Sequence, residues 1–233
     1  MSAGRAIGIV IASVVALTGL GLILGGGGVL IAERVLSDDS GFVALRPATI
    51  EAAGSAFVVP AEILVGDGLS TGAALDDQQL QSLRTRSELV LARTRALSLL
   101  SRAAQTRRGL ARKLEARGFS PPAVRAAVAR MVELGYLDDR AFALDWARAR
   151  SAARAEGLKA VYRGLIRHGV PRPIAAEAAD EVCSAEAELE VARRLAVGLS
   201  PRAAANRLSA RGFRSRTIAR VLRELAGRRS APE

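Results

Sequence analysis

Residues 135–150 read Gly-Tyr-Leu-Asp-Asp-Arg-Ala-Phe-Ala-Leu-Asp-Trp-Ala-Arg-Ala-Arg and indicate how this chain folds. Gly135 follows an amphipathic run and suits the left-handed backbone position just past the end of a helix. Asp138 can accept hydrogen bonds from the free N–H groups that begin the next helix. The stretch therefore predicts a turn that joins two helices, with Asp138 and Asp139 as helix-start residues.

The scarce aromatic side chains gather in the same stretch. Aromatic residues make up only 3% of the chain, yet the single Trp and one of the two Tyr residues lie here. Phe142, Trp146 and Ala149 recur at three- and four-residue spacing, which predicts one buried face of the second helix. By itself this is the pattern of a capped core helix, and we expect Tyr136, Phe142 and Trp146 to lie in the core.

The stretch also resembles the Gly-Tyr-(Leu/Ile)-(Asp/Asn)-Asp-x-x-(Phe/Tyr)-Ala segment of the RecX family of recombinase regulators. Residues 106–119 resemble the first repeat of that family and residues 157–170 its second, so the resemblance runs over about residues 92–227. The residues that carry the central segment are Gly135, Tyr136, Leu137, Asp138, Asp139, Phe142 and Ala143, followed by Trp146, Arg148 and Arg150.

The resemblance implies a modulator of the RecA recombinase, usually an inhibitor, that lies in the groove of the RecA–DNA filament. The partners it implies are the RecA filament and the single-stranded DNA within it. It also favours a soluble protein in the cytoplasm, and we expect a monomer.

Composition and repeats predict the fold class. Helix-breaking residues are confined to a few junctions in the last two thirds of the chain, where Ala and Leu dominate, so this part should be helical. Residues 114–119, 165–170 and 208–213 align on an apolar residue and a terminal glycine, at offsets of 51 and 43 residues. Each offset is about the length of three short helices. We predict a mainly α protein whose tandem three-helix repeats form an elongated curved array.

The repeats divide the helical part into residues 80–137, 138–182 and 183–233. Residues 35–79 precede them and carry two β-like runs, Gly41–Leu45 and Ser55–Val59, which predict a small hairpin or a three-stranded piece.

Residues 1–34 form an apolar N-terminal segment, in which residues 6–32 are uncharged and long enough to cross a bilayer. Three interpretations stay open. The segment is a membrane anchor, a signal segment, or an extension from an early start codon. Hydropathy favours the anchor, whereas the resemblance favours a soluble protein.

Charge is divided between the two ends of the chain. The first 83 residues hold three basic and eight acidic residues, and the remainder holds 31 basic and 15 acidic residues. A basic helical body favours nucleic acid, an anionic membrane surface or an acidic protein as its partner.

A cation recurs at the same position of each repeat, in Arg108, Lys159 and Arg202. If Leu110 and Leu114 face the core, helical periodicity turns Arg108 toward solvent, and the same register applies to the other repeats. This recurrence favours a continuous basic track over chance alignment in an Arg-rich chain. The candidate partner-binding and nucleic-acid-binding residues are Arg108, Arg112, Arg150, Lys159, Arg163 and Arg202.

The sequence offers little for catalysis. Cys183 and His168 are the only Cys and His residues, so one chain cannot build a disulfide or a Cys/His zinc site. The Gly66–Gly72 loop lacks the Lys-Ser/Thr end of a Walker A element. We predict no enzyme activity, no cofactor and no metal. A free-standing basic DNA-binding protein is the main alternative to a RecA regulator, and a membrane-tethered helical scaffold is a third.

Overall fold

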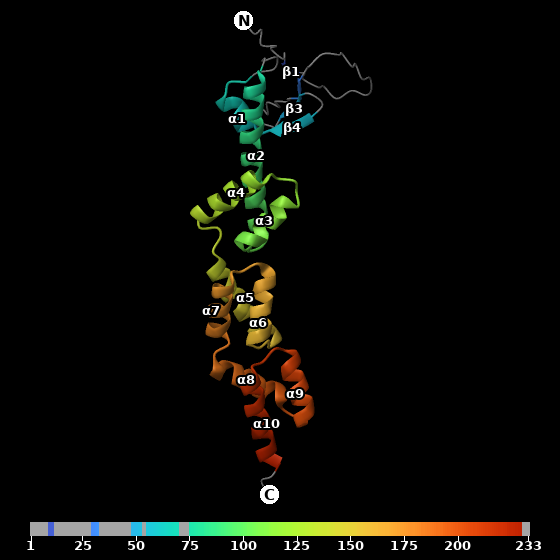
Figure 1. The fold of residues 1–233 in the computed structure, drawn as a ribbon, viewed down its shortest axis with the longest axis vertical. Coiled ribbons are helices and arrows are strands. Elements are labelled where there is room, and N and C mark those ends of the chain that lie inside the picture. The colour runs from blue at the N-terminus through green and yellow to red at the C-terminus, as the bar shows by residue number, and fades with distance from the viewer. Residues whose placement is uncertain (1–8, 12–28, 33–47, 53–54, 70–74, 230–233) are drawn as a thin grey trace, which may run out of the picture. The chain divides into compact units, whose positions relative to one another are not determined.

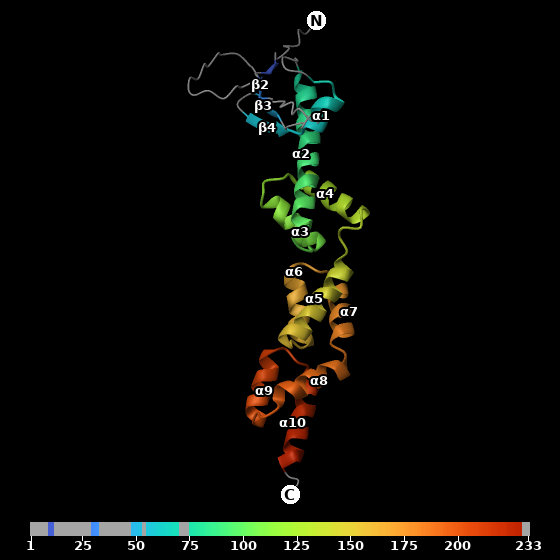
Figure 2. The same cartoon turned by 180° about the vertical axis from the view of Figure 1, so that it is seen from behind.

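The computed structural model describes residues 9–11, 29–32, 48–52, 55–69 and 75–229, and these are mainly helical (Figures 1 and 2). Contacts divide the chain into two compact units. The first comprises Met1–Ala96 with Leu114–Ala127, and the second comprises Leu97–Lys113 with Val128–Glu233.

The first unit contains a short four-stranded sheet in the order β1-β2-β3-β4. Its strands are β1 (Ile9–Ile11), β2 (Val29–Ala32), β3 (Ala48–Ala52) and β4 (Ser55–Val59). The β1 and β2 strands run parallel, and the other neighbours are antiparallel, with Ile50 opposite Phe57 in the β3–β4 hairpin.

The structure therefore contains a hairpin as predicted, and one of its two strands, β4, is a strand that the sequence predicted. β4 is the run expected at residues 55–59, and its partner is β3, whereas the run at residues 41–45 lies outside the described residues. Two parts of the apolar N-terminal segment are strands of this sheet. Among the helices of the described residues, none is long and apolar enough to cross a membrane.

The core of the first unit joins this sheet to two helices, α1 (Ala61–Gly66) and α2 (Asp77–Leu100). Ile50 and Val59 of the hairpin are fully buried with Leu83 of α2. A capping box begins α2, because Asp76 and Gln79 each accept the backbone N–H of the other, at 2.7 and 2.9 Å.

The remaining helices follow in groups of three (Figure 1). The first repeat adds α3 (Arg107–Glu115) and α4 (Pro121–Glu133) to α2; the second consists of α5 (Asp139–Arg154), α6 (Leu158–His168) and α7 (Arg172–Val182); the third consists of α8 (Ala185–Ala196), α9 (Pro201–Ala210) and α10 (Ser215–Arg229). The second and third groups each enclose a core of their own.

The turn after each middle helix confirms the repeat. Gly118, Gly169 and Gly212 have φ angles of 85°, 89° and 76°, in the left-handed region that glycine adopts without strain. The N–H of the residue after each glycine donates to the carbonyl oxygen of the aligned leucine, at 3.4, 3.1 and 3.2 Å in chain order. Those leucines, Leu114, Leu165 and Leu208, are fully buried. The three units thus end their middle helices with the same hydrogen-bonded cap.

The turn into α5 also forms as expected. Gly135 has a φ angle of 73°, and Asp138 accepts from the backbone N–H groups of Arg140 and Ala141 at 2.8 and 3.0 Å. Asp139 acts elsewhere, since its carboxylate is buried and accepts the N–H of Arg107 at 2.8 Å. It therefore caps α3 rather than its own helix.

Two side chains that we expected in the core are on the surface. Tyr136 is 58% exposed, because the left-handed Gly135 turns the chain so that Leu137 takes the buried position. Ala149 is exposed as well, and the buried face of α5 runs through Ala143 and Ala147. These small residues bring α5 close to its neighbours.

Phe142 and Trp146 lie at the edge of the second core, as partly buried residues. The Trp146 ring covers Gly164 of α6, where a Cβ atom would lie only 2.0 Å from Cη2 of the indole. Glycine is therefore needed at position 164 for space.

Candidate partner-binding surface

The middle helices of the three repeats are joined end to end within the second unit. Thr106 Oγ1, at the start of α3, donates to the carbonyl oxygen of His168 at the end of α6, at 2.7 Å. The N–H groups of Gly157 and Lys159, at the start of α6, donate to the carbonyl oxygens of Arg211 and Gly212 past the end of α9, both at 2.9 Å. We call this series α3, α6 and α9 the helix column. Its joints satisfy terminal groups of both helices that meet there.

A carboxylate from the following repeat closes each joint. At the joint of α3 and α6 it is Asp139. At the joint of α6 and α9 it is Glu188, which accepts from Leu158 N at 3.0 Å, Arg214 N at 3.1 Å and Thr217 Oγ1 at 2.8 Å. Glu188 is only 3% exposed, so these donors and Arg214, 3.6 Å away, take the place of the water that a buried carboxylate lacks.

The joints leave no room for larger residues at the glycines. A Cβ atom on Gly169 would lie 2.9 Å from Cβ of Arg108, and one on Gly212 would lie 2.5 Å from the backbone nitrogen of Ala160. A Cβ atom on Gly157 would lie 2.6 Å from Cα of Phe213.

Exposed cations run along the outer side of the helix column. They follow four-residue spacing on α3 and α6, which places them on one face of each helix. Within the described residues, the structure shows no carboxylate partner for any of them. We call them the column cations: Arg108 and Arg112 on α3, Lys159, Arg163 and Arg167 on α6, and Arg202 on α9.

Sequence reasoning had missed Arg167. Its spacing of four residues from Arg163 was the signal that could have found it. The other five column cations are exposed, as helical periodicity predicted.

Cations on other helices differ, because many of them pair with acids. Arg193 of α8 binds Glu224 at 2.7 Å, and Arg148 of α5 approaches Glu181 at 3.7 Å. Further ion pairs form at Arg140, Arg214 and Arg220. Other exposed arginines, such as Arg93, Arg125 and Arg223, also lack an ion pair among the described residues, so the column cations are distinguished by their regular spacing along α3 and α6.

His168 lies where α3 and α6 meet, and its pKa depends on the charged groups of both helices. Its ring lies 5.8 Å from that of Phe142 and 5.2 Å from that of Trp146. Desolvation lowers its pKa below the ordinary 6.5, and Arg150, Arg167, Arg112 and Lys113 lower it further. These surroundings therefore disfavour the protonated form of the His168 ring. Cations of α3 and α6 act on the same point.

Arg150 is the exception among the six candidate residues. Its side chain is 25% exposed, lies 3.1 Å from Glu156, and has its guanidinium 5.1 Å from the centre of the Trp146 ring. Its charge is compensated locally, so it is poorly placed to meet a phosphate.

Packing accounts for part of the recurrence of cations. The Arg108 side chain lies over Gly169, and Lys159 Nζ donates to Ser215 Oγ at 3.2 Å, so both cover the turn of the following repeat. Arg202 occupies the aligned position on α9, which is the third of the middle helices.

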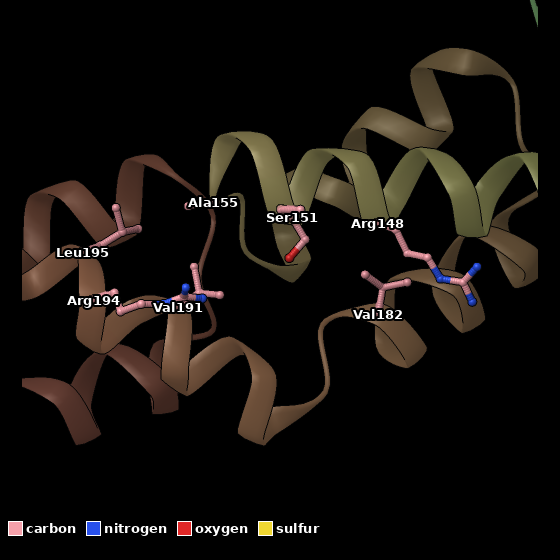
Figure 3. A pocket seen from close by; sticks show the side chains of 8 residues that line it. Arg148, Ser151, Ala155, Val182, Val191, Arg194 and Leu195 are labelled. Atoms are coloured by element: carbon pink, nitrogen blue, oxygen red, sulfur yellow. The ribbon is translucent and has the colours of Figure 1, made fainter.

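One cavity lies beside α6, and another lies between helices of the second and third repeats. One, of about 630 Å³, lies on α6 beside Tyr162, Arg163 and Arg167. The other, of about 600 Å³, lies where α5, α7 and α8 meet, with Val182, Val191 and Leu195 around it and Ser151 on the α5 side (Figure 3).

Comparisons with known proteins identify the family. A model of the first three-helix domain of RecX matches residues 92–131. The regulatory protein RecX of Stenotrophomonas maltophilia is 37% identical over 137 residues, which cover 55% of this chain and 83% of that protein. The chain belongs to the RecX family. RecX of Thermus thermophilus is likewise 37% identical, over 118 residues that cover 51% of this chain and 80% of that protein.

Other RecX proteins match over a smaller share. RecX of a Mycobacterium species is 36% identical over 99 residues. These residues cover 54% of that relative, about half of its length, and 42% of this chain.

Solved RecX structures share the fold. A crystal structure of a regulatory protein RecX matches with a TM-score of 0.61 at 20% identity, over 83% of this chain and 98% of that one. RecX from Lactobacillus salivarius matches with a TM-score of 0.54 at 21% identity, over 60% of this chain and 97% of that one.

Proposed function

We propose that this chain is a regulator of the RecA recombinase, and specifically an inhibitor, that lies in the groove of the RecA–DNA filament. The observation that carries the proposal is the row of column cations without carboxylate partners. The relatives named as RecX regulatory proteins support the regulatory role.

The helix column suits a phosphate backbone physically. Four residues of helix advance about 6 Å, so Lys159, Arg163 and Arg167 present charges at regular intervals along α6. Each cation that meets a phosphate releases condensed counterions, which makes the attraction strong and dependent on salt. Other faces of the repeats remain available to the protein of the filament.

The protein acts in this proposal as a monomer in the cytoplasm, and it performs no chemistry of its own. Regulation requires only that it binds the filament in competition with events that filament growth or turnover needs.

The test is the DNA-dependent ATPase of RecA, measured with rising concentrations of the protein. We expect inhibition at concentrations where binding to naked DNA is weak. The variant Arg112→Glu/Arg163→Glu/Arg167→Glu should lose the inhibition, because each change replaces an attractive contact with a repulsive one.

The matched control is Arg93→Glu/Arg125→Glu/Arg223→Glu. These three residues are exposed, have no ion pair with any residue that the structure describes, and lie on α2, α4 and α10. The control carries the same change in net charge and should inhibit like the unmodified protein. Equal loss in both variants would mean that net charge alone drives the effect.

Absence of any effect on the RecA ATPase, together with tight binding to naked DNA, would replace the proposal with that of a free-standing DNA-binding protein.

A further inference from the structure

The cavity on α6 combines an aromatic side chain with cations. Tyr162 is half-buried against the core of the second repeat and lines this cavity of about 630 Å³. Ile166 and Ala160 of α6 and Ala210 of α9 add apolar surface. A cavity of this size can enclose a planar ligand of the size of a nucleobase.

The charge around the cavity is positive. Arg163 and Arg167 of α6 and Arg172 of α7 line it, are exposed, and have no carboxylate partner among the described residues. The one acid of the lining, Glu156, is held by Arg150 through two contacts of 3.1 and 3.2 Å. An anion therefore meets three guanidinium groups and little opposing charge.

Tyr162 also lines a second cavity, of about 430 Å³, which it shares with Arg163. Leu158, Phe213 and Ile218 contribute apolar surface there. Tyr162 thus lines two cavities, and Arg163, one of the column cations of α6, lines both as well.

We infer that the α6 cavity binds an unpaired nucleobase of a single strand, with Tyr162 as its stacking surface and with Arg163, Arg167 and Arg172 on the neighbouring phosphates. A cavity with an aromatic wall can recognise a base, whereas cations alone recognise any polyanion. A base within a duplex stays paired and stacked, so it cannot enter. This inference rests on the proposed function, because it specifies which part of the bound DNA the helix column contacts.

The test compares two labelled strands of equal length and charge by fluorescence anisotropy. One is oligothymidine, and the other carries abasic sites along its whole length. We expect the protein to bind oligothymidine more tightly, by roughly 5- to 100-fold for a stacked base. A duplex of the same length should compete no better than the abasic strand.

Variants separate stacking from charge. Tyr162→Phe should keep the preference for bases, and Tyr162→Leu should lose it while binding of the abasic strand stays unchanged. Circular dichroism shows whether Tyr162→Leu is folded. Ala210→Leu adds a larger side chain to the cavity from the exposed end of α9 and should lose the preference too.

The inference is overturned if the unmodified protein binds both strands equally, or if Tyr162→Leu and Ala210→Leu both keep the preference. The RecA ATPase, measured on the same samples, separates the two proposals. Inhibition without a preference for bases removes only the base site, and a preference for bases without inhibition removes only the role in RecA regulation.

Discussion

At the scale of single residues, Glu188 holds the joint between the second and third repeats. Its carboxylate serves donors at the start of α6 and donors at the start of α10, which lie far apart in the sequence. Because the side chain is buried, water cannot replace it as the acceptor.

We therefore predict that Glu188→Ala lowers the free energy of unfolding by about 3–5 kcal/mol, as loss of one partner from a buried charged cluster does. Urea denaturation followed by circular dichroism measures the change. The control is Glu186→Ala in the same helix, where the side chain is exposed and the change should stay within about 0.5 kcal/mol. Similar losses in both variants would show that the effect comes from helix α8 itself.

Single residues show which roles could be predicted from the sequence and which could not. The cap at Asp138 was predictable because its donors lie two and three residues away. The role of Asp139 was not, because its donor, the N–H of Arg107, lies 32 residues away and on another helix. Tyr136 was misplaced for a related reason, since aromatic character indicates burial only when the backbone turns the side chain inward.

At the scale of elements, the joints of the helix column explain why cations recur near the starts of helices. A cation in the first turn opposes the helix dipole and is unfavourable in isolation. Here the start of α3 lies against the end of α6, whose carbonyl groups carry partial negative charge, so Arg108 is stabilised by the neighbouring helix. The periodicity of the sequence could predict the exposed face, but only the joints show which helices share it.

His168 is the only histidine of the chain, so its pKa can be followed to measure the effect of the cations around the joint of α3 and α6. We predict that the pKa of His168, followed by NMR of its ring protons, lies below 6.5 and rises toward that value in Arg167→Gln and in Arg112→Gln, because each change removes a cation that disfavours the protonated ring. The control Arg223→Gln, on α10, should leave it unchanged.

The sign also fixes the effect on stability. Since the pKa of His168 is lower in the folded state, its contribution to stability is lost as pH falls from 6.5 through the folded-state pKa. A pKa that did not respond to either substitution would show that the cations of α3 and α6 do not converge at this joint.

At the scale of the whole molecule, the three middle helices do not all begin in the same way. Arg107 and Leu158 begin α3 and α6 with N–H groups that carboxylates of the following repeat accept. Pro201 begins α9 and has no N–H. The first residue of α9 therefore has no backbone N–H that a carboxylate could accept, unlike the first residues of α3 and α6.

The N-terminal segment belongs structurally to the first unit. Deletion of residues 1–34 removes β1 and β2, and β2 pairs with β3 at Ile50, a fully buried residue of the first core. We predict that hydrogen exchange then becomes faster in residues 48–59, because β3 loses its neighbour.

The same deletion should leave exchange in α5 to α10 unchanged, since the second and third repeats enclose their own cores. Inhibition of the RecA ATPase should also persist, because the column cations lie outside the deleted segment. Mass spectrometry of peptides from both proteins gives the comparison. Faster exchange in α5 to α10 would show that the two units stabilise each other, and loss of inhibition with unchanged exchange there would place part of the partner-binding surface on the N-terminal segment.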